Sequence, residues 1–273
     1  MITKKHFRTV WLSDIHLGCK DCKANYLLDF LNHHTIDTLF LVGDIVDMWA
    51  LSKQFHWPAE HNQLFHKLLS LPNEGTKVIY LPGNHDEPAQ KYSHMSFGDV
   101  EIYREYIHTT ANGKKLLLLH GDQFDAEVCF GKAQAWLGDK GYDLLLFINR
   151  WYNIARSKNG YRYHSVAGYI KTRIRGANHA ISRYRNAAIA RAKAQQVDGI
   201  VCGHIHHPEI TEIDGITYYN DGDWIENCSA LTEDNHGHIS LTYWTQSSAQ
   251  EITQENKKRI RLLPIKTRDK KAA

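Results

Sequence analysis

The sequence predicts an α/β fold, because short strand-like runs alternate with amphipathic helices along much of the chain. Apolar runs bounded by Gly, Pro or Asp indicate buried strands at 7–13, 38–43, 77–82, 115–119 and 198–203. Apolar residues at three- and four-residue steps indicate helices at 23–34 and 59–71. This alternation favours right-handed crossovers and a largely parallel sheet, whose ligand site lies beyond the carboxyl ends of the strands.

The second half of the chain departs from this rhythm. Strand-like runs at 216–220 and 238–244 predict a second sheet or an antiparallel extension. Between them and the first strands, 127–197 has no strand-like run and is rich in Tyr, Arg, Lys and Ala at helical spacing. This stretch predicts a helical insertion, and its last helix is phased so that it buries Ile181, Tyr184, Ala188 and Ala192. We therefore divide the chain into a core of 1–126 and 198–256, the insertion 127–197 and a basic tail 257–273.

Composition is that of an ordinary globular protein, since 42% of the 273 residues are hydrophobic and 23% are charged. The net charge of +3 is too small to indicate a nucleic-acid partner, which needs a concentrated basic face. No apolar run approaches the length that spans a bilayer, and the N-terminus lacks the apolar core of a signal peptide. With 5 cysteines, an odd number, these features favour a reducing cytoplasm.

Cys19 and Cys22 form a CxxC pattern, which is typical of a redox pair or of half a zinc site. The sequence holds no second CxxC that would complete four zinc ligands. The zinc interpretation is therefore the weaker one.

Each of the five predicted strands ends in a turn whose side chains are able to bind metal. These turns hold Asp14 and His16; Asp44 and Asp47; Asn84, His85 and Asp86; His120 and Asp122; and His204 and His206. One such motif alone is more often an ordinary surface turn, but five at successive strand ends converge on one edge. The mixture of carboxylate, imidazole and amide ligands favours Mn²⁺, Fe²⁺ or Zn²⁺. The neighbouring glycines, which allow close approach by a compact anion, are Gly43, Gly83, Gly121 and Gly203.

The order DxH, GDxxD, GNH(D/E), a histidine turn and GHxH, from Asp14 to His206, resembles the calcineurin-like metallophosphoesterases. The resemblance implies a four-layer αββα sandwich in which the helical insertion forms a lid. It implies one metal bound by Asp14, His16 and His206, a second bound by Asn84, His120 and His204, and Asp44 bridging both. His85 takes the place of the family's catalytic histidine, and Asp86 is expected to orient it.

The resemblance also implies a reaction. Two divalent ions, Mn²⁺ by preference, would neutralise the phosphoryl oxygens and lower the pKa of a water molecule for attack on phosphorus. His85 is suited either to stabilise the developing charge or to protonate the leaving oxygen, and both roles stay open. A chain that had become a metal-free scaffold or binding module would be expected to lose ligands, whereas all seven positions hold them here.

Within this superfamily, the segments WLSDIHLG, LVGDIVDMW and HGDQFD, and the insertion before GHIHHP, resemble the UDP-2,3-diacylglucosamine diphosphatase group of lipid A biosynthesis. The resemblance implies cleavage of the pyrophosphate of UDP-2,3-diacylglucosamine to UMP and 2,3-diacylglucosamine 1-phosphate. Apolar residues of the insertion would then line an acyl pocket or simply pack against the domain, and these include Trp136, Leu144, Leu145, Leu146, Phe147, Ile148, Trp151 and Tyr152. Substrate contacts are predicted at Asn84, His85, Asp125, Arg156, Lys171, Arg173 and Arg175.

Other substrates remain open. The lipid A group carries Arg where this chain has His85, the residue of the wider superfamily, so another nucleotide diphosphate or phosphodiester is the alternative substrate. A phosphoprotein phosphatase and a nuclease rank below both. The expected location is cytoplasmic, with peripheral contact to the inner face of the inner membrane as an option. The sequence leaves the oligomeric state open.

Overall fold

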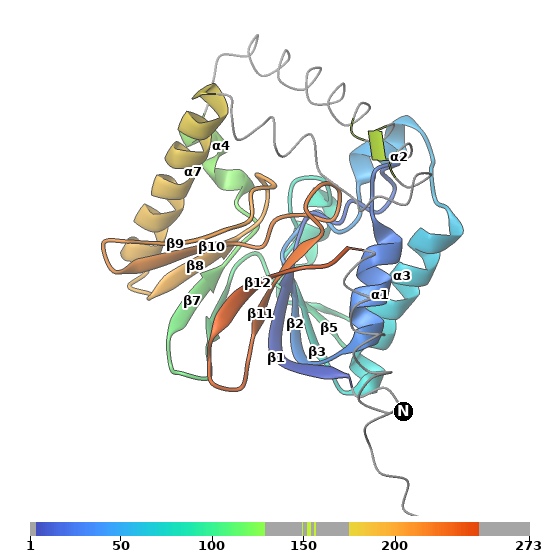
Figure 1. Ribbon diagram of the computed structural model, residues 1–273, viewed down its shortest axis with the longest axis horizontal. Helices are drawn as coiled ribbons and strands as arrows, with labels where there is room; N and C mark the ends of the chain where they lie inside the picture. The colour runs from blue at the N-terminus through green and yellow to red at the C-terminus, as the bar shows by residue number, and fades with distance from the viewer. Residues whose placement is uncertain (1–3, 129–148, 150–151, 154–155, 157–174, 246–273) are drawn as a thin grey trace, which may run out of the picture.

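The computed structural model describes residues 4–128, 149, 152–153, 156 and 175–245. Two mixed sheets pack face to face, and helices cover both outer faces (Figure 1). The first sheet has seven strands in the order β12 (Ile239–Tyr243), β11 (Ser229–Glu233), β1 (Lys5–Leu12), β2 (His34–Leu41), β3 (Lys77–Tyr80), β5 (Val100–Ile102) and β4 (Ser96–Phe97). Four of these seven strands, β1, β2, β3 and β5, are parallel to one another. Antiparallel strands extend the sheet at both edges.

The second sheet has five strands in the order β6 (Tyr106–Thr109), β7 (Lys115–Leu118), β8 (Gly199–Cys202), β10 (Ile216–Asn220) and β9 (Glu209–Ile213). Its central strands β7, β8 and β10 are parallel, whereas β6 and β9 pair antiparallel at the edges. Both sheets therefore have parallel strands at their centres. The carboxyl ends of these strands carry the predicted ligand turns.

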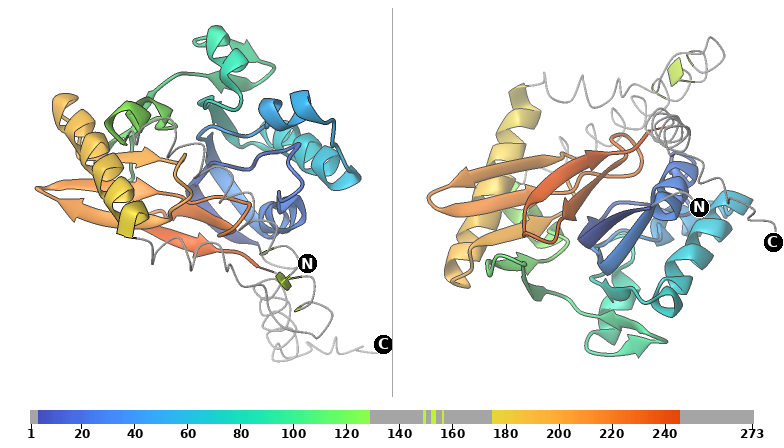
Figure 2. Two further views of the ribbon diagram at one scale, coloured as in Figure 1. Left: turned by 90° about the horizontal axis from the view of Figure 1, so that it is seen from above. Right: turned by 60° about the horizontal axis from the view of Figure 1, so that its bottom comes forward.

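Helices form the two outer layers (Figure 2). Helices α1 (Ala24–His33) and α3 (Ala59–Ser70) cover the first sheet, and α7 (Arg175–Ala194) covers the second. Shorter elements lie in the connections: α2 (Met48–Lys53), η1 (Pro72–Glu74), η2 (Glu87–Tyr92), η3 (Asp122–Phe124) and α4 (Asp125–Val128). This order of layers is the predicted αββα sandwich, which is thereby confirmed.

Three apolar clusters hold the layers together. Leu27, Leu31 and Leu64 of α1 and α3 pack against the first sheet, and Tyr184 and Ala188 of α7 pack against the second. A third cluster lies between the sheets and includes Trp11, Phe40, Ile79, Leu116, Leu118, Val201 and Leu231. Because both faces of each sheet are covered, the central strands are continuous apolar runs instead of alternating ones, as the sequence indicates.

The structure refines the predicted elements. The five predicted strands lie in two sheets, since β1, β2 and β3 belong to the first sheet and β7 and β8 to the second. The strand predicted at 238–244 returns to the first sheet as β12, and the strand at 216–220 is β10 of the second. The short strands β4, β5, β6, β9 and β11 were not predicted, because their runs are brief or carry many polar residues.

The predicted phase of the helix now seen as α7 is confirmed, since Ile181, Tyr184, Ala188 and Ala192 are all buried. Most of the remaining insertion and the tail 257–273 lie outside the described residues, so the proposed domain division stays a prediction. In the part of the chain that the structure describes, no helix combines the length and the hydropathy that a membrane span requires. Cys19 and Cys22 are free thiols, and neither belongs to a metal-binding cluster of the described residues.

His34 gives the fold a measurable pH dependence. It is buried at the start of β2, where its ring lies 4.4 Å from that of Phe30 and 5.0 Å from that of Trp244, and its Nδ1 donates to the Phe30 carbonyl at 2.7 Å. Burial in this aromatic surrounding lowers the pKa of His34 to about 4. The folded state therefore resists protonation that the unfolded chain accepts near pH 6.5, so stability falls as the pH decreases from about 6.5 toward 4.

We expect the low pKa of His34 to decrease the free energy of unfolding by up to about 3 kcal/mol at the acid end of that range. Urea denaturation at about pH 7.5 and about pH 4.5 measures the loss in the wild type and in His34→Gln, which cannot become charged. The variant should lose less stability than the wild type on acidification. An identical loss in both proteins would contradict the assignment.

Candidate metal centre

The ligand turns are brought together by backbone hydrogen bonds between neighbouring strand ends. The Asp14 N–H donates to the Gly43 carbonyl at 3.0 Å, and the His16 N–H donates to the Asp44 carbonyl at 2.9 Å. The Gly203 N–H donates to the His120 carbonyl at 3.0 Å in the second sheet. The turns after β1 and β2, and those after β7 and β8, are thus fixed as pairs.

One group of side chains combines Asp14, His16 and His206. Asp14 Oδ1 lies 3.2 Å from His206 Nε2 and 3.7 Å from His16 Nε2. His16 Nε2 also lies 3.7 Å from Asp44 Oδ2. These three residues are the ones that the family resemblance implies as ligands of the first metal.

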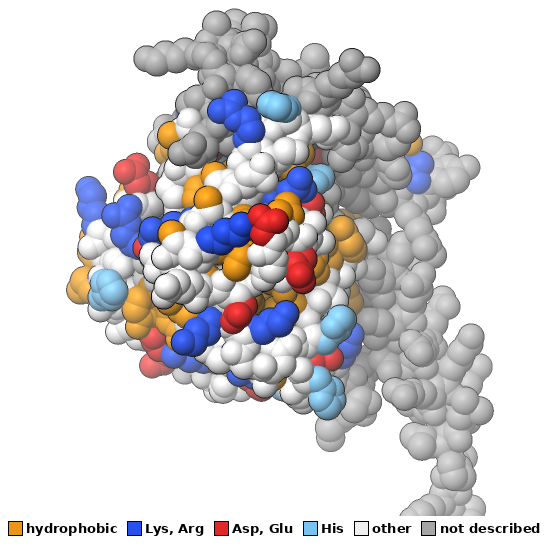
Figure 3. All heavy atoms as spheres, turned by 90° about the vertical axis from the view of Figure 1, so that its left-hand side faces the viewer, with side chains coloured by type: hydrophobic (Ala, Val, Ile, Leu, Met, Phe, Trp, Pro, Cys, Tyr) orange, Lys and Arg blue, Asp and Glu red, His pale blue; other side chains and the backbone are white. Residues whose placement is uncertain are grey.

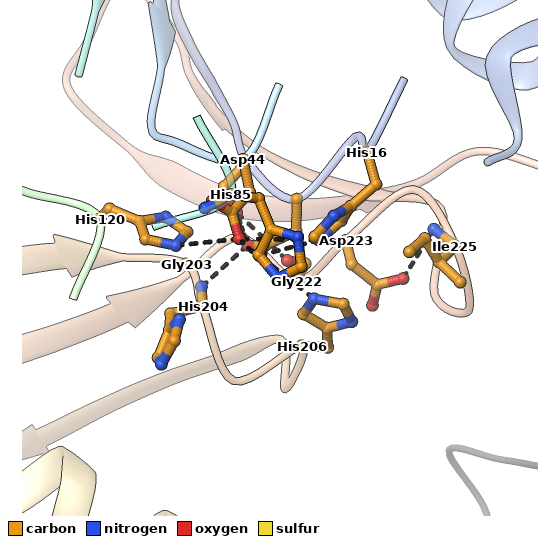
Figure 4. A network of polar contacts seen from close by, with 12 residues as sticks. His16, Asp44, His85, His120, Gly203, His204, His206, Gly222, Asp223 and Ile225 are labelled. Atoms are coloured by element: carbon orange, nitrogen blue, oxygen red, sulfur yellow. Dashed lines mark hydrogen bonds and ion pairs between the residues drawn. The ribbon is translucent and has the colours of Figure 1, made fainter. Parts of the chain in front are cut away.

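A second group combines Asp44, His120 and His204. His120 Nε2 lies 3.3 Å from Asp44 Oδ2 and 3.2 Å from Asn84 Oδ1, because His120 Nδ1 donates to the Val42 carbonyl and thereby orients the ring. Asp44 contacts an imidazole of each group, as a bridging carboxylate would. Figure 4 shows the rings of His16, His85 and His120 gathered around Asp44, with His204 and His206 carried by the turn after β8.

The donor set fits a divalent metal ion. Asp14 Oδ1 and His16 Nε2 are buried, and among the described residues neither makes a hydrogen bond of good geometry, although Asp14 Oδ1 lies within ion-pair distance of His206 Nε2, at 3.2 Å. Buried polar atoms without partners are costly, so two that lie 3.7 Å apart are suited to share a cation. Carboxylate, imidazole and amide donors in one place are the mixture that transition metals accept.

The electrostatics of the two groups are tightly linked. Burial opposes ionisation of Asp44, yet His120 and His16 lower its pKa to about 2. Burial likewise opposes protonation of His120, but Asp44 and Asp14 raise its pKa to about 10. For Asp14, contacts with His206 and His16 outweigh burial and hold its pKa well below the usual range. The carboxylates thus remain charged and strongly favour a positive partner.

Asp47 holds two histidines at once. Its Oδ2 lies 3.1 Å from His16 Nδ1, and its Oδ1 lies 3.0 Å from His85 Nδ1. Both imidazoles therefore direct their Nε2 atoms toward Asp44, at 3.7 Å for His16 and 4.0 Å for His85. Although burial opposes it, hydrogen bonds from the two rings lower the pKa of Asp47. Trp49 also packs against His85, with ring centroids 4.2 Å apart.

The structure corrects the role expected for Asp86. Its buried carboxylate accepts hydrogen bonds from the N–H groups of Gly83 at 2.5 Å, Ile45 at 2.8 Å and Asp44 at 3.3 Å. It shapes the ligand turns, whereas Asp47 orients His85. Sequence proximity favoured Asp86, but the chain turns back at Gly83 and carries the Asp86 carboxylate away from the His85 ring.

Glycine is required where the turns approach each other most closely. A Cβ on Gly43, whose φ is 87°, would overlap the ring of His120. A Cβ on Gly203 would overlap the Ser13 hydroxyl. These glycines therefore allow the ligand turns to pack against each other. This role adds to the one expected from the sequence, which is to let a compact anion approach the backbone.

The predicted substrate contacts are placed unevenly. Asn84 and His85 border the metal-binding groups, and Asp125 Oδ1 lies 2.7 Å from His204 Nε2. Arg156 donates to the Tyr152 hydroxyl at 3.2 Å. Arg175 is the first residue of α7, and Lys171 and Arg173 lie outside the described residues, as do Trp136, 144–148 and Trp151.

The segment Asn220–Trp224 was not predicted as part of the site, but it is buried and its hydrogen bonds hold the ligand turns. Asn220 Nδ2 donates to the Gly203 carbonyl at 2.8 Å, and the Trp224 N–H donates to the Asp14 carbonyl at 3.0 Å. Asp221 reaches the Ser13 hydroxyl at 2.7 Å. The signal was available, because the turn Asp221–Trp224 directly follows the strand predicted at 216–220, just as the other ligand turns follow their strands.

A two-sheet αββα sandwich with aspartates, histidines and an asparagine gathered at its strand ends defines a class, the phosphoester hydrolases with metal-binding sites. The family model "Calcineurin-like phosphoesterase" matches residues 7–208, more than half of the chain. The chain therefore belongs to the calcineurin-like phosphoesterase family and is a phosphoester or diphosphate hydrolase. The family implies divalent metals, in agreement with the aspartate and histidine groups.

The chain is also similar to curated proteins named UDP-2,3-diacylglucosamine hydrolase. The protein from Psychromonas ingrahamii is 24% identical over 249 residues, covering 81% of this chain and 91% of its own. The protein from Tolumonas auensis is 25% identical over 224 residues, covering 75% and 82%. A solved structure of Vps29 from Entamoeba histolytica complexed with zinc is 16% identical, with a TM-score of 0.45 over 87% of this chain and 91% of that chain.

The double contact of Asp47 leads to a prediction. Asp47→Asn leaves an amide that cannot accept both imidazole N–H groups, so His16 and His85 lose their orientation. We expect hydrolysis of bis-p-nitrophenyl phosphate to fall about 10- to 100-fold. Asp37→Asn serves as the matched control, since among the described residues Asp37 pairs only with the exposed His6, and the loss of this pair should leave turnover unchanged. Wild-type turnover in Asp47→Asn would contradict the role.

Proposed function

We propose that the chain is a dinuclear metal-dependent hydrolase that cleaves the pyrophosphate of UDP-2,3-diacylglucosamine to UMP and 2,3-diacylglucosamine 1-phosphate. The observation that carries the catalytic part is the contact of Asp44 with imidazoles of both groups, at 3.7 Å from His16 and 3.3 Å from His120. A carboxylate in this position is suited to bridge two cations. Relatives named for this lipid substrate support the finer assignment.

The proposed ligands of the first metal are Asp14, His16 and His206, and those of the second are Asn84, His120 and His204, with Asp44 shared. Mn²⁺ is the preferred ion, and Fe²⁺ and Zn²⁺ suit the same donors. When bound, the two ions would neutralise phosphoryl oxygens and lower the pKa of a water molecule.

His85 is proposed as the catalytic residue beside these ligands. It is one-quarter exposed, and Asp47 accepts from its Nδ1, so its Nε2 points toward Asp44 at 4.0 Å, beside the proposed metal ligands. From there Nε2 would donate to a phosphoryl oxygen or to the leaving oxygen, both of which gain negative charge during cleavage. Trp49 and Asp47 together restrict rotation of the ring.

Metal removal tests the centre. Treatment with EDTA should abolish hydrolysis of bis-p-nitrophenyl phosphate, and Mn²⁺ should restore it. Saturating Mn²⁺ should also stabilise the fold, by about 2.7 kcal/mol at a hundred times the dissociation constant. His204→Ala removes a proposed ligand of the second metal, so it should lose the restored hydrolysis and show a smaller stabilisation, whereas His66→Ala, at an exposed position of α3, should keep both responses. A wild type that neither binds Mn²⁺ nor turns over would support the metal-free scaffold alternative instead.

An apolar surface beside His85 supports a lipid substrate. Trp49 and Met48 of α2 are 49% and 37% exposed, and Phe55, just after this helix, is 79% exposed. Exposed apolar groups at the rim of a polar site suit a ligand that has both acyl chains and phosphates. A lipid substrate would also bring the protein to a membrane surface, and we propose peripheral contact at the cytoplasmic face of the inner membrane.

The alternative substrate is another nucleotide diphosphate or phosphodiester, and His85 favours it because the lipid A group carries Arg there. Purified protein with Mn²⁺ and detergent is incubated with UDP-2,3-diacylglucosamine or with a water-soluble nucleotide diphosphate sugar. We expect UMP release from the lipid substrate at a kcat/KM at least about tenfold higher. Release of UMP from the soluble compound alone would overturn the lipid assignment and leave phosphoester hydrolysis intact.

Nuclease activity has less support. On the face over α7, cations and acids are interspersed (Figure 3), and three basic residues of this helix pair with acids of other elements. These pairs are Arg185 with Glu209, Arg191 with Glu105, and Lys193 with Asp214. A surface that binds a nucleic-acid backbone needs Lys and Arg side chains that contact phosphates, whereas these three basic residues already contact acidic side chains of the protein.

A further inference from the structure

The Ser13 hydroxyl lies between two buried carboxyl groups. Its Oγ is 2.5 Å from Asp14 Oδ2, 2.7 Å from Asp221 Oδ1 and 3.3 Å from the Gly222 carbonyl oxygen. Ser13, Asp14 and Asp221 are all at most 1% exposed. The three contacts therefore form within the protein interior, directly beneath the first group of proposed metal ligands.

The number of protons in this arrangement is informative. An ionised carboxylate only accepts hydrogen bonds, and a serine hydroxyl has one proton to donate. If both acids are ionised, the Ser13 hydroxyl can donate its proton to only one of them. The second carboxylate would then lie at hydrogen-bond distance from Ser13 Oγ with no proton between the two oxygens. Both short contacts become favourable if one of the two acids carries a proton and donates it to Ser13 Oγ.

Three observations identify Asp221 as the protonated acid. Asp14 contacts His206 at 3.2 Å and accepts the His204 N–H at 2.8 Å, so it is surrounded by groups that stabilise a negative charge. Asp221 forms no ion pair with any Lys, Arg or His of the described residues, and its Oδ2 is buried without a hydrogen-bond partner among them. Burial raises the pKa of Asp221 well above its usual range.

We propose that Asp221 is a neutral carboxylic acid that donates to Ser13, so that Ser13 donates to Asp14 Oδ2 and leaves Asp14 Oδ1 free to bind a metal ion at the proposed first site. Asp221 and Ser13 are thus positioning residues for a ligand. The role at the metal rests on the proposed function, whereas the protonation of Asp221 does not. A neutral acid also avoids placing another negative charge beneath a site that already holds Asp14 and Asp44.

The test compares Asp221→Asn, Asp221→Ala, Ser13→Ala and the double variant Ser13→Ala/Asp221→Ala. Titration calorimetry with Mn²⁺ alone gives the metal affinity, and thermal unfolding reports whether each variant folds. Asparagine is neutral and donates from Nδ2, so Asp221→Asn should bind Mn²⁺ within about threefold of the wild type. Asp221→Ala and Ser13→Ala should each weaken binding about 10- to 100-fold, and the double variant no more than either single one.

Infrared difference spectra at neutral pH provide a readout independent of metal. The wild type should show the C=O stretching band of a protonated carboxylic acid that Asp221→Asn lacks. Absence of this band, an affinity loss in Asp221→Asn as large as in Asp221→Ala, or additive losses in the double variant would each overturn the proposal. If alanine variants fail to fold, the asparagine variant and the spectrum still decide it. A wild type with the band but without Mn²⁺ binding would refute the metal centre and leave the protonation of Asp221 established.

Discussion

The structure depends on holding two buried carboxylates close together. Asp14 and Asp44 each place an oxygen 3.7 Å from the same atom, His16 Nε2, and all three side chains are buried. Like charges at such separations repel strongly when they are buried, so the fold needs compensating positive charge there. Imidazoles supply part of it, as the raised pKa of His120 shows. Divalent cations would supply the rest, and this requirement explains why carboxylates, histidines and tight turns occur together.

The backbone also carries a cost at this site. Five of the proposed ligands, which are not glycines, have positive φ angles between 50° and 69°: Asp14, His16, Asp44, His204 and His206. Each such residue costs on the order of 1 kcal/mol or more, and the surrounding structure must enforce it. Hydrogen bonds between the turns provide that enforcement, for example from the His16 N–H to the Asp44 carbonyl. Asp and His tolerate this region better than most residues, so the ligand chemistry and the backbone geometry are compatible.

Features determined by local sequence were predictable, and features that depend on the path of the chain between turns were not. The strand-end positions of Asp14, Asp44 and His120 follow from apolar runs that stop at a polar turn, and the buried face of α7 follows from helical spacing. The orientation of His85 could not be obtained in this way. Asp86 is its neighbour in sequence, but the turn after β2 brings Asp47 to the ring instead. The split of the strands over two sheets was equally hidden, since a parallel strand has the same apolar pattern in either sheet.

The location of the site between the sheets links metal binding to assembly of the sandwich. Asp14, His16, Asp44 and Asn84 follow strands of the first sheet, whereas His120, His204 and His206 follow strands of the second. Each proposed metal therefore has ligands from both sheets. Two hydrogen bonds also join the sheets, one from the His204 N–H to Asp14 and one from His120 Nδ1 to the Val42 carbonyl. A cation bound at this seam would favour the packed sandwich over states in which the sheets separate. Without it, the repulsion between carboxylates opposes the same packing, so the interface that forms the site is also the part of the fold most sensitive to metal.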